Sequence, residues 1–308
     1  MFKAGVVGVG NIGQGLVHNL LSKGYETHLY APRSHEDIAA MAARGGVLHY
    51  DLAELGACCD MVFIAVFSAD QVREVALGDG GLFASMPAGG AVAVCSTIDP
   101  SVLRELDAEA SRRGLSLIDC PVSGGRQGAS NGSLLLMAAC PDEVFAQYQE
   151  VHSAVGGHVR QVGKQPGLGQ IAKATVQIMV SLNALVASEA LVLGTKAGLD
   201  PELLLDILTH SYGTSRVLEE KAPVMLERDF HSTGGLNIHV KDLDVGLRLG
   251  RELEVPLFLS SLARELYVAC EGKGWGREDF CAVLKLYEEI AGVEFIQKEK
   301  LNNDQKKQ

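Results

Sequence analysis

The stretch Gly8-Val9-Gly10-Asn11-Ile12-Gly13, almost at the start of the chain, decides the fold. An apolar run at residues 4–9, which overlaps the start of this stretch, is typical of a buried strand. An amphipathic helical pattern follows at residues 13–22. In this order, the glycines let a pyrophosphate approach the backbone and the N-terminus of the helix attracts its charge. Glycine-rich turns also arise for purely structural reasons, but this context predicts a dinucleotide-binding site.

The first half of the chain alternates short apolar runs with helical patterns. Such alternation is typical of an α/β fold with a doubly wound parallel sheet. We therefore predict an N-terminal Rossmann domain over residues 1–165. Strands are expected at residues 4–9, 27–30, 47–50, 61–67, 90–95, 116–119 and 134–139, and helices at 13–22, 35–44, 69–76, 100–113 and 142–155.

The pattern changes after residue 165. Apolar residues recur at helical spacing over residues 170–197, which predicts one long helix joining the two halves. The rest also reads as helix, so we predict an all-α C-terminal domain over residues 166–295. The polar, charged tail at residues 296–308 is expected to be disordered. Further helices are expected at residues 201–211, 217–227, 240–253, 260–272 and 278–291.

Composition narrows the class of protein. The formal net charge of −11 argues against broad nucleic-acid binding, which needs a basic face. Seven scattered cysteines without a CxxC pair favour reduced thiols in a cytoplasmic protein, with neither a disulfide framework nor a metal site. No continuous apolar run approaches 18 residues, so we expect a soluble chain without a membrane span.

The end of the second strand bears on the choice of cofactor. In NAD-binding domains an acidic residue roughly 20 residues after the glycines holds the ribose 2′-hydroxyl. Here Ala31 stands in that place, and Arg33 and Ser34 follow it. These two side chains can contact a 2′-phosphate, which favours NADP over NAD. The alternative is that Arg33 is an ordinary solvated loop residue.

Two further strand ends should border the cofactor, because ligands bind at the carboxyl ends of parallel strands. Val66 and Phe67 close the run at residues 61–67. Ser96-Thr97-Ile98-Asp99-Pro100 follows the next strand, and this stretch is expected to approach the nicotinamide. The same stretch also has the composition of a helix cap, and both readings can hold together.

Two segments carry the expected chemistry. Ser123-Gly124-Gly125 follows a strand and can present consecutive backbone N–H groups and a hydroxyl to an anion such as a carboxylate. Lys173 and Gln177 lie four residues apart on one face of the long helix. A lysine beside a nicotinamide can exchange a proton with an alcohol or a carbonyl oxygen. The alternative is that Lys173 is a solvated surface residue.

In order along the chain, these segments resemble the β-hydroxyacid dehydrogenase family, which includes 3-hydroxyisobutyrate dehydrogenase, tartronate semialdehyde reductase and L-threonate dehydrogenase. The resemblance covers about residues 3–292, and Lys241-Asp242-Leu243 is a further matching segment. It implies an NAD(P)-dependent oxidoreductase acting on CH–OH groups. It also implies a 6-phosphogluconate dehydrogenase-like C-terminal domain that binds the substrate and dimerises, in a homodimer or homotetramer.

The resemblance also assigns residue roles. It implies that Lys173 is the general acid/base, that Ser123, Gly124 and Gly125 hold the substrate carboxylate, and that Gln177 and Lys241 contact the substrate. The implied reaction is reversible hydride transfer between the nicotinamide and the C3 hydroxyl or carbonyl of a small β-hydroxy acid. The expected cofactor contacts are Gly8, Val9, Gly10, Asn11, Ile12, Gly13, Arg33, Ser34, Val66, Phe67, Thr97 and Lys241.

Three positions depart from the family pattern. Gln177 stands where the family usually has an Asn that hydrogen-bonds the substrate, and the L-threonate-type branch also carries Gln there. Gly234 replaces an aromatic residue ahead of Lys241 and should open the pocket wall. Val66-Phe67 replaces a frequent Leu-Pro. These departures favour polyhydroxy substrates over a simple 3-hydroxyisobutyrate.

Two other functions share parts of this pattern. An imine reductase has the same two-domain plan but typically lacks a lysine at the position of Lys173. A non-catalytic NADP-binding module would keep the fold without needing that lysine. Lys173 therefore favours the dehydrogenase over both.

Overall fold

The computed structural model describes residues 1–32, 36–231 and 234–293. By compactness the chain divides into two units, Met1–Lys173 and Ala174–Gln308. The expected contacts of Arg33 and Ser34, and the expected tail at residues 296–308, lie outside the described residues.

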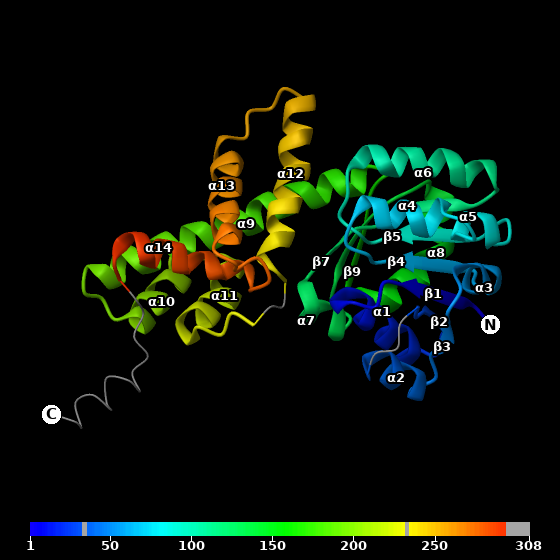
Figure 1. The fold of residues 1–308 in the computed structure, drawn as a ribbon, viewed down its shortest axis with the longest axis horizontal. Helices are drawn as coiled ribbons and strands as arrows, with labels where there is room; N and C mark the ends of the chain where they lie inside the picture. The colour runs from blue at the N-terminus through cyan, green and yellow to red at the C-terminus, as the bar shows by residue number, and fades with distance from the viewer. Residues whose placement is uncertain (33–35, 232–233, 294–308) are drawn as a thin grey trace. The chain divides into compact units, whose positions relative to one another are not determined.

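The first unit is built on one nine-stranded sheet (Figure 1). Its strand order is β3-β2-β1-β4-β5-β6-β8-β7, with β9 paired to β8. Strands β1 to β6 are all parallel. The chain adds β2 and β3 on one side of β1, and β4, β5 and β6 on the other. Such sheets bind ligands at the carboxyl ends of the strands where the strand order switches sides, here between β1 and β4. The predicted doubly wound parallel sheet is confirmed. The strands are β1 (Lys3–Val7), β2 (Glu26–Tyr30), β3 (Val47–His49), β4 (Met61–Ile64), β5 (Ala91–Val94), β6 (Ser116–Asp119), β7 (Val122–Ser123), β8 (Leu135–Ala139) and β9 (His158–Gly163).

Helices pack on both faces of this sheet (Figure 1). Successive strand side chains point to opposite faces, so Phe63 joins the core under α1, α2 and α8, while Ile64 joins the core under α3 to α6. Each face therefore carries its own apolar core. The helices are α1 (Asn11–Ser22), α2 (Glu36–Ala43), α3 (Leu52–Cys58), α4 (Ala69–Leu77), α5 (Leu82–Ser85), α6 (Pro100–Arg112), α7 (Gly125–Ser130) and α8 (Asp142–Val155).

Some elements differ from the expectations. The strand expected at residues 61–67 ends at Ile64. Ala65 N still donates to the Val7 carbonyl at 2.8 Å. The apolar run in the sequence therefore continues beyond the end of the strand. Strand β9 has no expected counterpart, because its mostly exposed residues form no apolar run. Helix α3 was not expected from the sequence either. Its N-terminus is capped by the Asp51 carboxylate, which accepts from Ala53 N at 2.6 Å.

The second unit is helical over its described residues 174–231 and 234–293, as expected, apart from one isolated bridge between Gly235 and Asp279. The helix expected at residues 278–291 is divided into a 3₁₀ turn and an α-helix. The elements are α9 (Leu168–Lys196), which begins in the first unit, α10 (Pro201–Thr209), α11 (Arg216–Glu227), α12 (Leu236–Glu252), α13 (Phe258–Gly272), η1 (Phe280–Val283) and α14 (Leu284–Ala291).

Helix α9 is long and apolar enough to cross a membrane by length and composition alone, with a mean hydropathy of 1.8 in its most apolar window. Of that window, 44% is buried within the protein, and Leu185 and Leu191 belong to cores of the second unit. The same helix also buries Gln177 and Ser181. Helix α9 therefore packs into the cores of the second unit along one face, while Met179, Val186 and Leu193 on the same helix are exposed.

The start of α9 is fixed by the buried carboxylate of Asp119, the last residue of β6. One oxygen accepts from Gly167 N at 2.7 Å and from Gln170 N at 3.2 Å, and the other accepts from Gln170 Nε2 at 2.8 Å. A Cβ on Gly169 would lie 2.8 Å from this carboxylate, so only glycine fits there. The carboxylate satisfies N–H groups at the positive end of the helix and ties α9 to the sheet.

Burial raises the pKa of Asp119 from 3.8 to about 6, against the opposing effect of the hydrogen bonds from Gln170, Gly167 and Gly169. Between these values the folded chain keeps a proton that the unfolded chain has released, so stability falls as pH rises through this window. Relative to Asp119→Asn, which has no such titration, the wild-type free energy of unfolding should fall by about 2 kcal/mol between pH 4 and pH 7.

Urea unfolding followed by circular dichroism at several pH values measures this difference. Asp70→Asn is the matched control, because the Asp70 side chain is 97% exposed. Its stability difference from wild type should stay nearly constant over the same range. A wild-type to Asp119→Asn difference that does not change with pH would contradict the account of the buried carboxyl.

Candidate active site

The glycine turn between β1 and α1 leaves room at the N-terminus of the helix. Gly8 has a φ of 91°, and a Cβ there would lie 2.4 Å from the Ala65 carbonyl oxygen. A Cβ on Gly13 would lie 1.9 Å from the Gly8 oxygen, so that position also admits only glycine. A Cβ on Gly10, in contrast, would meet nothing within 4 Å, and Gly10 caps α1 without a side-chain hydrogen bond. The open, uncapped helix start fits a pyrophosphate.

The ends of β4 and β5 lie beside this turn and are locked together. Ser96 Oγ accepts from Val66 N at 3.0 Å and donates to Val66 O at 2.7 Å. Phe67 N donates to Gln71 Oε1 at 2.9 Å, and the Phe67 side chain is half exposed. Thr97 is partly exposed. The expected cofactor residues of these two strands thus lie at the carboxyl edge that also carries the glycine turn.

The end of β2 matches the sequence reading as far as it is described. Ala31 is fully buried, and its N donates to the His49 carbonyl at 2.8 Å. The place of a ribose-binding acid is therefore occupied by a small apolar residue within the core.

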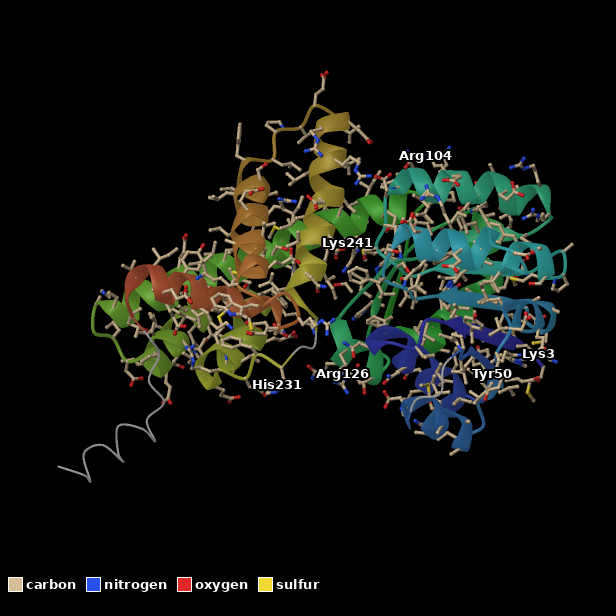
Figure 2. All side chains as sticks on the ribbon, viewed as in Figure 1. Lys3, Tyr50, Arg104, Arg126, His231 and Lys241 are labelled. Carbon is tan, nitrogen blue, oxygen red and sulfur yellow. The ribbon has the colours of Figure 1, made fainter. Side chains whose placement is uncertain are left out.

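The loop from β7 into α7 carries the expected anion-binding residues. Gly124 has a φ of 128° and Gly125 a φ of 59°, conformations that favour glycine, and both residues are exposed. Ser123 is partly buried and pairs with Leu135 of β8. Arg126 follows at the exposed start of α7, as Figure 2 shows. The backbone here is accessible and shaped for close approach by a ligand.

Lys173 is buried, with 7% of its surface exposed, so the alternative of a solvated surface lysine is wrong. It lies one turn beyond Gln170, whose side chain links three elements. Gln170 Nε2 donates to Ser96 O at 3.1 Å and to Asp119 Oδ1 at 2.8 Å, and Gln170 Oε1 accepts from Ile98 N at 2.9 Å. The turn of α9 that carries Lys173 is therefore tied to the loop that carries Thr97.

The remaining expected residues belong to the second unit. Gln177 is buried on α9, and Lys241 is partly buried on α12 (Figure 2). Both contact the buried carboxylate of Asp242: Gln177 Nε2 donates at 2.6 Å and Lys241 Nζ at 2.6 Å. A Cβ on Gly234 would meet nothing within 4 Å, so this position is open. Asp242 therefore fixes the orientation of both side chains.

Sequence reasoning did not assign a role to three residues that organise these sites. Asp119 is the last residue of the strand expected at residues 116–119, Asp242 stands inside the segment quoted with Lys241, and Gln170 opens the long helix. A carboxylate that ends an apolar strand, as Asp119 does, is a usable signal, because a buried charge needs hydrogen-bond partners. Gln170 carries no such signal, since its partners lie 51 to 74 residues away in the chain.

Comparison with known proteins agrees with this architecture. Residues 3–163 match the family described as the NAD-binding domain of 6-phosphogluconate dehydrogenase. Residues 167–287 match the family described as the NAD-binding domain of NADP-dependent 3-hydroxyisobutyrate dehydrogenase.

Individual relatives extend over nearly the whole chain. An L-threonate dehydrogenase from Cupriavidus necator is 34% identical over 92% of this chain and 95% of its own length. A solved 3-hydroxyisobutyrate dehydrogenase from Salmonella typhimurium has a TM-score of 0.86 and 30% identity, over 93% of this chain and all of its own. A solved complex of Psf3 with NADP⁺ and 2-OPP has a TM-score of 0.84 and 25% identity, over 92% of this chain and 99% of its own. The chain belongs to the β-hydroxyacid dehydrogenase family and is a nicotinamide-dependent oxidoreductase.

Proposed function

We propose that this enzyme transfers a hydride reversibly between NADP and the hydroxyl-bearing carbon of a small hydroxy acid, with Lys173 as the general acid/base. The observation that carries the proposal is the anchoring of α9 by Asp119 and Gln170. It holds a buried lysine at a fixed turn in the unit that also carries the glycine turn and the Ser123-Gly124-Gly125 loop. The bound nicotinamide supplies the hydride acceptor or donor.

In the oxidation direction, neutral Lys173 accepts the hydroxyl proton while the hydride leaves the same carbon. In the reverse direction the lysine ammonium donates that proton to the carbonyl oxygen. Ser123 and the backbone N–H groups of Gly124 and Gly125 would hold the carboxylate and so orient the reacting carbon. The expected product is oxidised at C3, the carbon β to the carboxylate.

The contacts around Gln177 support a polyhydroxy substrate. The Asp242 carboxylate accepts a hydrogen bond from the Gln177 amide N–H, so the amide is held in one orientation and its oxygen is directed away from Asp242. An amide held in one orientation presents its hydrogen-bonding groups in a fixed direction, which favours a substrate whose hydroxyl groups match that direction. Several relatives are named L-threonate dehydrogenases, which agrees with this substrate class.

NADP is the proposed cofactor and the cytoplasm the proposed location. Ala31 leaves no carboxylate to hold a ribose hydroxyl, and Psf3 is a structural relative solved with NADP⁺. All seven cysteines lie in the described residues as free thiols, as expected in a reducing compartment. We propose a homodimer or homotetramer as the assembly.

Lys173→Ala should lower kcat by about 10²- to 10⁴-fold, because the proton acceptor is lost while cofactor contacts remain. Steady-state kinetics at saturating substrate measures this loss, and NADPH fluorescence titration should show nearly unchanged cofactor binding. Lys164→Ala is the matched control, since the Lys164 side chain is 70% exposed and pairs only with Asp142 among the ion pairs described. A kcat near wild type for Lys173→Ala would exclude the acid/base role.

The KM for NADPH should be lower than that for NADH, and Arg33→Ala should reduce the difference. The physical reason is the loss of a cation that meets the 2′-phosphate, which NADH lacks. KM values for both cofactors, measured with one substrate, decide the point. A lower KM for NADH in the wild type would reject the preference for NADP.

Among small hydroxy acids, L-threonate should give a higher kcat/KM than 3-hydroxyisobutyrate. The assay follows NADPH formation with each acid, and product analysis identifies the oxidised carbon. Equal or better turnover of 3-hydroxyisobutyrate would contradict the polyhydroxy substrate class. Oxidation at C2 instead of C3 would contradict the proposed reacting carbon but leave the dehydrogenase activity standing.

A further inference from the structure

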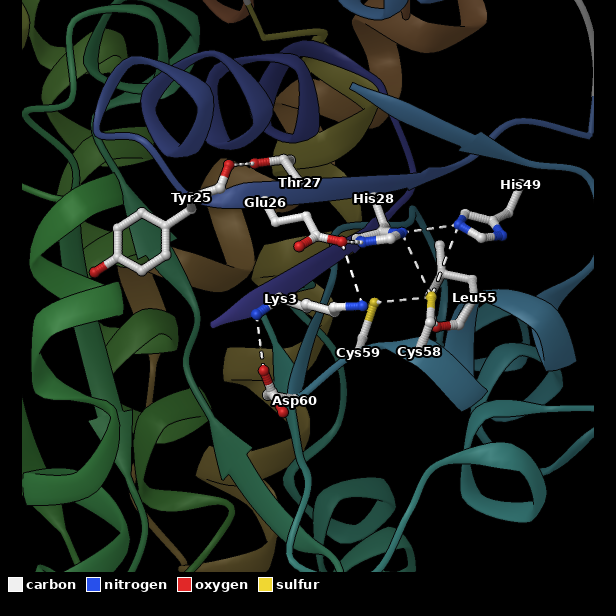
Figure 3. Close-up of polar contacts among 10 residues, drawn as sticks. All are labelled: Lys3, Tyr25, Glu26, Thr27, His28, His49, Leu55, Cys58, Cys59 and Asp60. Carbon is white, nitrogen blue, oxygen red and sulfur yellow. Dashed lines mark hydrogen bonds and ion pairs between the residues drawn. The ribbon is translucent and has the colours of Figure 1, made fainter. Parts of the chain in front are cut away.

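A cluster of three potential metal ligands lies at the β2–β3 edge of the first unit (Figure 3). His28 belongs to β2, His49 ends β3 and Cys58 ends α3. His28 Nδ1 is 2.9 Å from His49 Nε2, and Cys58 Sγ is 3.4 Å from His28 Nδ1 and 3.8 Å from His49 Nε2. All three atoms lie within 4.8 Å of one another, so they converge on one point.

These separations match the ligand sphere of a single tetrahedral ion. Zinc bonds of about 2.05 Å to nitrogen and 2.3 Å to sulfur place two nitrogens about 3.4 Å apart and a nitrogen and a sulfur about 3.6 Å apart. The observed distances of 2.9, 3.4 and 3.8 Å each lie within about 0.5 Å of these values. Hydrogen bonds also fit these distances, and the Cys58 thiol donates to Leu55 O at 3.3 Å. A single ion would replace these contacts with three bonds to one centre.

The surroundings of His28 are those of a metal ligand. Its other ring nitrogen, Nε2, lies 3.2 Å from Glu26 Oε1, and Lys3 Nζ lies 3.3 Å from the same oxygen. A carboxylate that accepts this N–H fixes the tautomer, so the lone pair of Nδ1 is directed at His49 and Cys58. Metal-binding histidines almost always have such an outer partner.

We propose that His28, His49 and Cys58 bind one Zn²⁺ ion through Nδ1, Nε2 and Sγ, with water in the fourth position. Two imidazoles and a thiolate suit a borderline-soft transition metal and exclude Mg²⁺ and Ca²⁺, which prefer oxygen ligands. Binding releases the thiol proton of Cys58 to solvent, and the Nε2 proton of His49 moves to Nδ1 by exchange with water. Both imidazoles remain neutral.

The ion would join a short edge strand to its neighbour and to the helix that covers it. Strand β3 has three residues and, within the described part of the chain, pairs only with β2. The His49 carbonyl also accepts from Ala31 N, directly after the end of β2. The site thus lies beside the strand end expected to distinguish the cofactors, yet uses none of the residues proposed for catalysis.

The full-length untagged protein, stripped with chelator and dialysed, provides the test. Titration with Co²⁺ should give the d–d bands of a tetrahedral site and a thiolate-to-cobalt charge-transfer band, at one ion per chain. Zn²⁺ should displace Co²⁺ and raise the melting temperature, because it binds the folded state. The wild-type spectrum decides the proposal independently of how any variant folds.

Variants identify the ligands. His49→Gln and Cys58→Ser should each weaken Zn²⁺ binding by at least about 100-fold, and Glu26→Gln by about 10-fold. Two matched controls should keep wild-type affinity: Cys59→Ala, whose sulfur approaches Cys58 Sγ only to 4.0 Å, and His158→Gln, an exposed histidine of β9. The metal-free melting temperature of each variant separates lost ligands from lost folding.

Wild-type protein without a charge-transfer band and without a thermal shift would overturn the proposal. Equal Zn²⁺ affinity in wild type, His49→Gln and Cys58→Ser would also overturn it. Neither result would bear on the proposed dehydrogenase activity, because hydride transfer is measured in a separate assay.

Discussion

The buried carboxylate of Asp119 is the interaction on which the rest of the proposed site depends. A charge in the core is costly unless it is fully hydrogen-bonded, and here the bonds come from the first turn of α9 and from Gln170. Because the buried carboxylate needs these hydrogen bonds, α9 has to begin where its first N–H groups can donate to it. Because a helix is rigid, Lys173 follows one turn later at a defined place.

A second buried carboxylate performs a similar task in the second unit. Asp242 binds Gln177 and Lys241 at once, so two long, flexible side chains have one arrangement. In both units an acid beside the expected functional residues limits their freedom. Residues that contact a ligand need such support, since a misplaced group contributes little to orientation.

The fold was largely predictable, because its signals are local. Apolar runs and helical spacing identified the sheet and the helical half, while β9 escaped because its residues are mostly exposed and form no apolar run. The cluster of His28, His49 and Cys58 was not predictable, since the three residues have no motif spacing and meet only through strand pairing and helix packing. The cysteine pattern even argued against a metal.

The sequence by itself determined the glycine turn and the family. The glycines at positions 8, 10 and 13 indicate a particular backbone turn from the local sequence alone, without any distant partner. Only the tertiary structure decided that Lys173 is buried instead of solvated, and that Gly169 makes room for the Asp119 carboxylate. The physical reason is that burial and hydrogen-bond partners arise from residues up to 74 positions apart, whose meeting no local pattern records.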